Sequence, residues 1–157
     1  MTIAEHEIFK ALGDWGNSLI AISQAYEDTG LNAARDVAEK TLDRLYGFEL
    51  GPVLFKPTLS GGLQTFRPTK TGALSYFIGH DPDYPDDSGF GIKFWRSVKP
   101  ETSATFVRND VAIWMGWVSF IDKNKAVIKV DKTFGYTKDK DGNLKIILHH
   151  SSLPFVS

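Results

Sequence analysis

The first part of the chain alternates apolar and polar residues with the period of a helix. Apolar side chains recur at spacings of three and four, which places them on one stripe of a long amphipathic helix: Ile8, Leu12, Trp15, Leu19, Ile22 and Tyr26. Thr2 and Glu5 have capping-box spacing, so we expect this helix to begin at Ile3. Asp28-Thr29-Gly30 reads as its end.

A second helical pattern follows this stop. Asn32 is its expected N-cap residue. Its buried side is predicted to contain Ala34, Val37, Ala38, Thr41, Leu42, Leu45 and Tyr46. Gly47 and Gly51-Pro52 then end the helical part of the chain.

From Val53 onward the pattern is typical of strands and turns. The predicted extended segments are 53–59, 64–67, 73–79, 90–98, 111–121, 126–136 and 144–152. Short turns join the last three into an antiparallel meander. The order of helices and strands predicts an α+β fold in which N-terminal helices pack on one face of a curved antiparallel sheet. We expect one domain over residues 1–157.

The last strand combines apolar side chains with a dense polar cluster. Because successive side chains of a strand point to opposite faces, Ile147, His149 and Ser151 are predicted to share one face. His150 and Ser152 then lie on the other face, with Ile146 and Leu148. The two His-Ser pairs are therefore expected to have different roles, His149 with Ser151 in a pocket and His150 with Ser152 in packing or an interface.

Composition narrows the possible functions. The formal net charge is -1, which favours neither nucleic acid nor an acidic membrane surface as a partner. There is no cysteine, which excludes thiol nucleophiles, disulfides and cysteine metal sites. The first ten residues contain Glu5 and Glu7 and do not resemble a signal peptide, so a cytoplasmic location is expected.

The segment 111–121 is apolar on both of its predicted faces. Trp114, Met115, Trp117, Val118 and Phe120 follow one another closely within it. The N-terminal helices can cover only one face of the sheet, so the other face needs cover as well. A homodimer formed through the sheet face is the simplest source of that cover.

The residue inventory gives little material for a metal centre, and we expect no metal or other cofactor. His149 and His150 point to opposite faces of one strand, whereas His80 lies in a predicted loop and His6 near a terminus. The acidic residues Asp81, Asp83, Asp86 and Asp87 lack the spacing of an EF-hand, and we interpret them as a solvated loop. Arg67 and Arg96 are interpreted as surface residues and left outside the site.

Four short segments carry a resemblance to a known family: Phe55-Lys56-Pro57-Thr58, Ala73-Leu74-Ser75-Tyr76-Phe77, Gly91-Ile92-Lys93-Phe94 and His149-His150-Ser151-Ser152-Leu153-Pro154. They are similar to the iota-class carbonic anhydrases, over roughly Trp15 to Pro154. The overall pattern also resembles the cone-shaped, cystatin-like fold of the nuclear transport factor 2 (NTF2) superfamily, and within it the association domain of calcium/calmodulin-dependent kinase II.

This resemblance implies reversible hydration of carbon dioxide to bicarbonate in a homodimer or higher oligomer. It also implies a metal-free pocket at the base of the cone, lined by hydroxyl groups. The matching positions are Thr58 and Ser151, which would hold substrate or product, and Tyr76, which would bind substrate and take part in catalysis. Ser151 is expected to be catalytic too. His149 joins them because it shares a strand face with Ser151, and a neutral imidazole can take the proton directly or through Tyr76.

Other interpretations of the same residues remain open at this point. His149 can be a hydrogen-bonded core histidine, and Ser151 can cap the strand end. The alternative function is a non-enzymatic oligomerisation or small-molecule-binding module of the same fold, which an aromatic-filled cone would favour. An isomerase or dehydratase is a third possibility, although the predicted strands offer few inward-facing acids; Asp131 is the only one deep in a strand.

Overall fold

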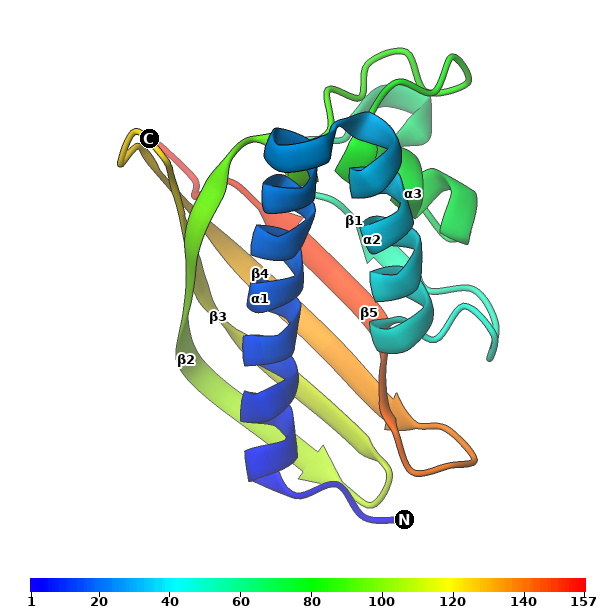
Figure 1. Cartoon of the computed structure of the whole chain (residues 1–157). Helices are drawn as coiled ribbons and strands as arrows, with labels where there is room; N and C mark the ends of the chain where they lie inside the picture. The colour runs from blue at the N-terminus through cyan, green and yellow to red at the C-terminus, as the bar shows by residue number, and fades with distance from the viewer.

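Two long helices open the chain and pack side by side, as the computed structural model of residues 1–157 shows (Figure 1). Helix α1 spans Glu5–Thr29 and α2 spans Leu31–Leu45. The predicted apolar stripe of α1 is confirmed, because its apolar side chains from Ile8 to Ile22 are buried. Gly16 lets this helix approach the sheet, since a Cβ at that position would lie 3.0 Å from Cβ of Val98.

The predicted helix starts were wrong by a few residues. Glu7, rather than Glu5, accepts a hydrogen bond from the backbone N–H of Ala4 at 2.8 Å, so α1 begins two residues later than expected. Gly30 ends α1 and is also the N-cap of α2, with φ at 101°. Asn32 therefore lies inside α2, and a glycine in a conformation unfavourable for other residues makes the sharp turn between the helices.

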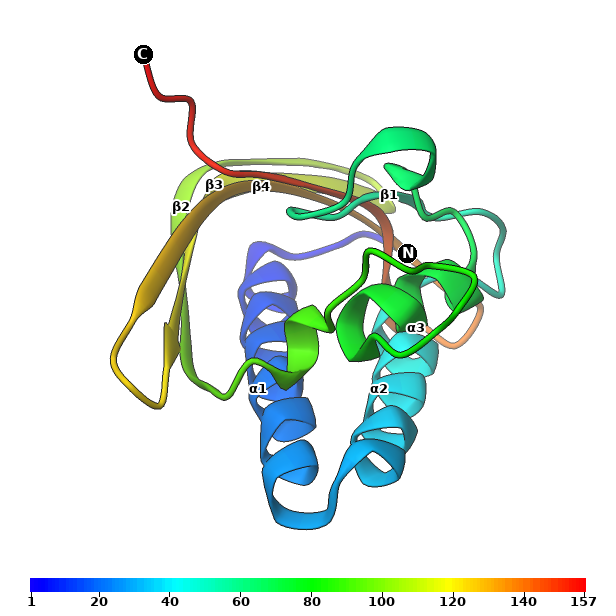
Figure 2. The ribbon, with the colours of Figure 1, turned by 90° about the horizontal axis from the view of Figure 1, so that it is seen from above.

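A five-stranded sheet curves around the helix pair (Figure 2). Its strands are β1 (Leu54–Lys56), β2 (Trp95–Arg108), β3 (Val111–Asp122), β4 (Val127–Lys138) and β5 (Leu144–Ser152), in the spatial order β1-β5-β4-β3-β2. The last three strands form the predicted antiparallel meander, and β2 extends it as a fourth long strand paired with β3. The short β1 pairs with β5 in parallel, so the sheet is not purely antiparallel. The α+β fold class is confirmed.

Two predicted extended segments were wrong, and a third was wrong in its first half. Residues 73–79 belong to helix α3, Lys70–Ile78, which the Thr69 side chain caps by accepting from the N–H of Gly72. Residues 64–67 form no strand and follow the 3₁₀ turn Gly62–Gln64. The segment 90–98 begins with the 3₁₀ turn Phe90–Ile92, and β2 runs on to Arg108. Nearly every side chain of α3 from Gly72 to Ile78 is buried, so the segment has no one-sided pattern to reveal its period.

The last strand contains a bulge that the alternation rule did not anticipate. Tyr136 pairs with Ile146, whereas the neighbouring Gly135 pairs with Leu148, so Ile147 is an extra residue. The inner face of β5 therefore contains Ile146 together with His149 and Ser151. Beyond the bulge the predicted split is confirmed, because His149 and Ser151 are buried and His150 is exposed.

The core lies between the concave face of the sheet and the helices. It is rich in large aromatic side chains, among them Trp15, Phe55, Phe90, Phe120 and Phe134. Many of these rings meet edge to face or stacked, with centroids about 5–6 Å apart. None of the helices has the length and hydrophobicity that crossing a bilayer requires.

Candidate active site

Two predicted site residues, Ser151 on the inner face of β5 and Thr58 just after β1, lie next to each other. Ser151 is fully buried, and its Oγ lies 2.5 Å from Oγ1 of Thr58, which follows β1. The parallel pairing of β1 with β5 creates this contact, because Lys56 is the register partner of His150 and the chain then continues past Ser151. Two residues 93 positions apart in the sequence thus share one hydrogen bond.

Tyr76 reaches the same region from α3. Its hydroxyl accepts a hydrogen bond from the backbone N–H of Leu59 at 3.2 Å, one residue beyond Thr58. Burial raises the pKa of Tyr76 to about 12, while the Leu59 N–H and the Thr58 hydroxyl lower it by less. The phenol therefore remains protonated at neutral pH. Its O–H proton is not used in a bond to the protein and can be donated to a molecule in the pocket.

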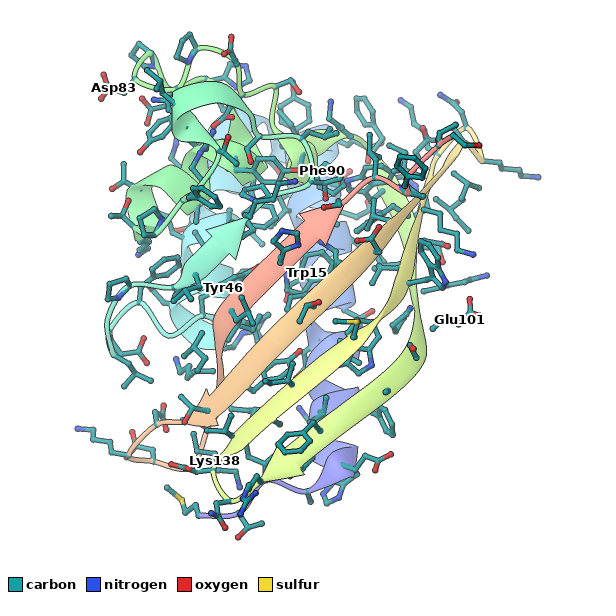
Figure 3. The ribbon with its side chains drawn as sticks, turned by 180° about the vertical axis from the view of Figure 1, so that it is seen from behind. Trp15, Tyr46, Asp83, Phe90, Glu101 and Lys138 are labelled. Atoms are coloured by element: carbon teal, nitrogen blue, oxygen red, sulfur yellow. The ribbon has the colours of Figure 1, made fainter.

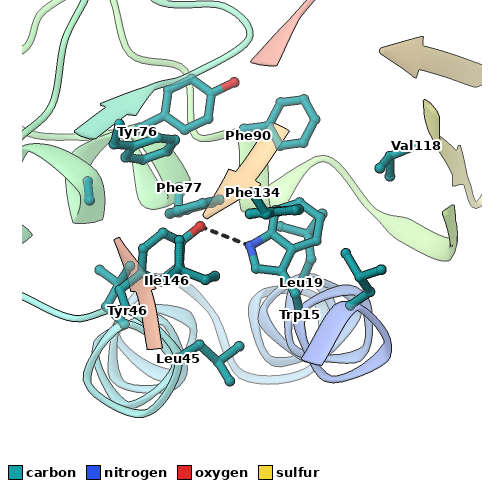
Figure 4. Close-up of a cluster of buried hydrophobic side chains, with 14 of the residues drawn as sticks. Trp15, Leu19, Leu45, Tyr46, Tyr76, Phe77, Phe90, Val118, Phe134 and Ile146 are labelled. Atoms are coloured by element: carbon teal, nitrogen blue, oxygen red, sulfur yellow. Dashed lines mark hydrogen bonds between the residues drawn. The ribbon is translucent and has the colours of Figure 1, made fainter. Parts of the chain in front are cut away.

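His149 lies between aromatic rings and makes two hydrogen bonds. Its ring stacks at 4.5 Å from the ring of Phe55 and lies 4.5 Å from that of Phe134. Nδ1 is 2.8 Å from the hydroxyl of Tyr46, which also accepts from Nε1–H of Trp15 at 2.9 Å. Figure 4 shows this Trp15–Tyr46 bond as a dashed line within the aromatic core. Burial, and then the nearby Lys132, lower the pKa of His149 well below its usual value, so the imidazole is neutral.

The second ring nitrogen of His149 meets Lys132, which was not among the predicted site residues. Nζ of Lys132, on β4, lies 2.8 Å from Nε2 of His149, and the Lys132 side chain is only 3% exposed. Burial, and then the positive charge of Lys56, lower the pKa of Lys132 to about 7, against a smaller opposing effect of Asp131. A lysine with this pKa exchanges a proton near neutral pH.

A sequence signal for Lys132 was present in β4. Positions 130, 132, 134 and 136 alternate onto one strand face, and the other three members are Val130, Phe134 and Tyr136. A lysine within an otherwise apolar face is a buried charge that needs a reason. The register makes the pairing explicit, since Lys132 is the cross-strand partner of Ser151 and Phe134 that of His149.

These residues surround one small pocket. It is narrow and closely packed. Its lining combines polar and aromatic side chains: Trp15, Phe55, Pro57, Thr58, Tyr76, Phe77, Phe90, Lys132 and His149. The structure thus brings Thr58, Tyr76 and His149 to one pocket, with Ser151 bonded to Thr58 behind it. No hydrogen bond joins His149 to Tyr76, so the predicted proton route through Tyr76 has no direct path in this arrangement.

The acidic loop after α3 is solvated as expected at Asp83 and Asp86, but not at Asp87. Asp87 is almost fully buried and accepts two hydrogen bonds from the guanidinium of Arg67, at 2.7 and 2.8 Å. Ser75 on α3 donates to the same carboxylate at 2.6 Å. Arg67 is therefore a buried residue and not a surface one, because Asp87 neutralises its charge.

The donor set of the pocket consists of hydroxyl groups, one amine and one imidazole. No three side chains of His, Asp or Glu converge closely enough to hold a metal ion. The chemistry that this set supports is hydrogen bonding to a small oxygen-containing molecule and exchange of a proton with it.

Comparison with solved structures first defines the class of fold. An association domain of the calcium/calmodulin-dependent kinase II type from Xanthomonas campestris superposes with a TM-score of 0.55 at 23% identity, over 97% of this chain and 89% of that chain. An NTF2-like protein from Streptomyces avermitilis gives 0.57 at 13% identity, over 96% of both chains. At these identities the likeness concerns the fold alone, and it confirms the predicted NTF2-like cone.

The family is defined by stronger matches. Residues 6–153 match the family "Metal-independent carbonic anhydrase". A metal-independent carbonic anhydrase of Nostoc sp. (strain PCC 7120 / SAG 25.82 / UTEX 2576) is 46% identical over 153 residues, 98% of this chain and 75% of that protein. A crystal structure of a cyanobacterial iota-carbonic anhydrase complexed with bicarbonate superposes with a TM-score of 0.98 at 45% identity, over 99% and 95% of the two chains. This chain therefore belongs to the metal-independent carbonic anhydrase family, which confirms the predicted family and enzyme class.

Proposed function

We propose that this protein catalyses the reversible hydration of carbon dioxide to bicarbonate, without a metal ion, in the pocket beside Thr58, Tyr76 and Ser151. Family membership and the bicarbonate complex of the 45% identical cyanobacterial enzyme support the reaction. The observation that carries the proposal in this chain is the convergence of three hydroxyl groups, from the segment after β1, from α3 and from β5.

The hydroxyl groups match the needs of a bicarbonate ion. When Thr58 and Ser151 share one hydrogen bond, one of the two hydroxyls donates to the other, and the second retains its own proton for an oxygen of the product. Tyr76 supplies another donor, because its oxygen already accepts from Leu59. Donors placed where negative charge develops stabilise the transition state more than the uncharged substrate.

The remaining pocket wall suits carbon dioxide, which is apolar. Phe55, Phe77 and Phe90 line the pocket, and the ring of Tyr76 stacks on that of Phe90 with centroids 5.7 Å apart. This wall excludes bulk water, so hydrogen bonds inside the pocket are stronger than in bulk solvent. The lining is largely aromatic and closely packed, and it is family membership that favours the enzyme over a non-enzymatic module.

The test is stopped-flow hydration of carbon dioxide by chelator-treated protein. We expect activity above the buffer rate and no loss on chelation. Tyr76→Phe and Ser151→Ala each remove one donor and are expected to lower kcat/KM about 10²-fold. Matched controls are Tyr26→Phe and Ser152→Ala, which lie outside the pocket and should retain wild-type rates. Absence of activity in untreated wild-type protein would refute the enzyme, and loss of activity on chelation would refute the metal-free reaction.

We propose further that the protein forms a homodimer through the outer face of the sheet. Figure 3 shows the sheet from the side opposite to the helices. Large apolar side chains are exposed on strands β2 to β4: Phe106, Val111, Ile113, Met115, Trp117 and Val127. Pairing such a face with a second copy would remove this apolar surface from water. His150 shares the outer face with Met115 through Thr133, consistent with its predicted interface role.

A further inference from the structure

Lys132 is a buried amine with no carboxylate partner. It takes part in none of the ion pairs of the molecule, and its single hydrogen-bond partner is Nε2 of His149. Nζ also lies 4.9 Å from the ring of Trp15 and 5.6 Å from that of Phe120. Aromatic faces stabilise an ammonium only in part, so the charge of this group is costly and its neutral form is accessible.

The charged and titratable groups around Lys132 come from three strands. Lys56 on β1 disfavours a positive charge at Lys132, and Asp131 on β4 favours it. On β5, His149 is bonded to the amine, and His150 points outward. The residue of α1 that contacts the amine is Trp15, which carries no titratable group. Taken together, burial and Lys56 outweigh Asp131, which places the protonation of this amine near neutral pH.

The other groups of the pocket are poor proton acceptors. Both nitrogens of His149 are occupied, one by Tyr46 and one by Lys132. The pKa of Tyr76 is raised, so its hydroxyl is a donor at neutral pH. Thr58 and Ser151 are alcohols, which are not basic. Lys132 is the one pocket residue whose nitrogen can bind a proton in this pH range and release it again.

The direction of the hydrogen bonds sets the orientation of the amine. An ammonium can only donate hydrogen bonds. When Lys132 is charged, Nε2 of His149 must therefore accept its hydrogen bond, and the imidazole carries its hydrogen on Nδ1, which donates to the hydroxyl oxygen of Tyr46. If the neutral amine keeps this arrangement, it donates one N–H to Nε2 and its lone pair is free. The opposite tautomer would direct Nε2–H at that lone pair and block it. Only the first arrangement accommodates both protonation states of Lys132.

We propose that Lys132 is the general base of the hydration reaction, held by His149 as a positioning residue. This assignment rests on the proposed carbonic anhydrase activity. The oxygen of a pocket water attacks the carbon of carbon dioxide, and one C=O electron pair moves to the oxygen that Thr58, Ser151 or Tyr76 binds. The water O–H bond breaks and its proton goes to Nζ of Lys132, which gives bicarbonate and an ammonium. The ammonium then loses its proton to solvent or buffer.

The first experiment compares Lys132→Met and Lys132→Arg with wild type in stopped-flow hydration between pH 6 and pH 9. In wild type kcat/KM should rise with pH through a midpoint near 7, because the neutral amine is the active form. Both variants should lose about 10²-fold or more of kcat/KM and this pH dependence. Arginine retains the charge and donors but stays protonated. Lys140→Met, in an exposed turn, is the matched control and should behave as wild type.

The outcomes separate the base from its rivals. An active Lys132→Arg enzyme with the wild-type pH profile would refute the role of Lys132 as general base. Lys132 would then serve only as a positive charge beside bicarbonate. An inactive wild-type protein would refute the proposed function rather than this assignment. Thermal melting of Lys132→Met, expected at or above the wild-type temperature because a buried amine is removed, establishes that the variant folds.

A second measurement needs no variant. The ¹⁵N chemical shifts of the His149 ring report its tautomer, and we expect hydrogen on Nδ1 at both pH 6 and pH 9. Hydrogen on Nε2 at pH 9 would mean that the lone pair of Lys132 is engaged, and it would overturn the proposal. A carbamate carbon on Lys132 in protein equilibrated with ¹³C-labelled carbon dioxide would overturn it as well, because the amine would then be a nucleophile towards the substrate.

Discussion

Two buried tyrosines differ in one respect that decides what their hydroxyl groups contribute. The hydroxyl of Tyr46 bonds to Trp15 and to His149, whereas that of Tyr136 is buried without any partner. Removing a bonded hydroxyl leaves its partners unsatisfied, and removing an unpaired one relieves a desolvation cost. The same substitution should therefore have opposite effects at the two positions.

Tyr46→Phe should lower the free energy of unfolding by about 1–3 kcal/mol, because Trp15 and His149 each lose a partner. It should also reduce hydration activity, since His149 then holds Lys132 less firmly. Tyr136→Phe serves as the control and should change stability by no more than about 1 kcal/mol, toward higher stability. Urea unfolding measures both. A Tyr46→Phe protein as stable as Tyr136→Phe would show that the hydrogen-bond chain contributes nothing.

At this scale the sequence led to part of the site. Thr58, Tyr76, Ser151 and His149 were located, the first three through motif resemblance and His149 through strand alternation, and the structure places all four around one pocket. Lys132 could not be recognised from its residue type, because lysine is normally a surface residue; only the apolar face that surrounds it in β4 marks it as buried. The partners of His149 could not be predicted, because they depend on Trp15 of α1, Tyr46 at the end of α2 and Lys132 of β4 meeting in space.

At the scale of elements, α3 shows what sequence patterns cannot resolve. Its segment was predicted to be a strand, but a helix and a strand can both bury a short apolar run. The helical conformation is determined by the Thr69 cap and by packing on both sides of the segment. The long strands β3, β4 and β5 were predicted well because hairpin turns mark their ends. The bulge at Ile147 adds a residue that alternation alone cannot reveal.

The buried ion pair between Arg67 and Asp87 fastens two elements next to the pocket. Arg67 precedes α3, Asp87 lies in the loop after it, and Ser75 within α3 bonds to the same carboxylate. Asp87→Asn removes the charge that neutralises Arg67, and we expect it to cost about 3 kcal/mol in the free energy of unfolding. Because α3 carries Tyr76, activity should fall too. Asp86→Asn, at the exposed neighbouring position, is the control and should change neither the stability nor the activity. Equal stability of the two variants would mean that the ion pair does not fasten this loop.

At the scale of the whole molecule, the outer face of the sheet remains to be covered. Trp117 and Met115 lie on β3, Ile113 continues the same face, and all three are at least a third exposed. Trp117→Glu places a charge at the centre of this apolar surface, where an interface would desolvate it. If the proposed homodimer forms, the wild type should have twice the chain mass of 17.5 kDa in light scattering, and Trp117→Glu should have the mass of one chain.

Leu63→Glu is the matched control, because Leu63 is fully exposed on a 3₁₀ turn outside the strands β2 to β4 that carry the proposed interface, and its change should leave the dimer intact. The pocket lies on the concave side of the sheet, opposite to this interface, so a monomeric Trp117→Glu protein should retain its hydrogen-bonded pocket and a measurable hydration rate. A wild-type protein that is monomeric at micromolar concentration would contradict the interface. A dimeric Trp117→Glu protein would place the interface elsewhere on the molecule.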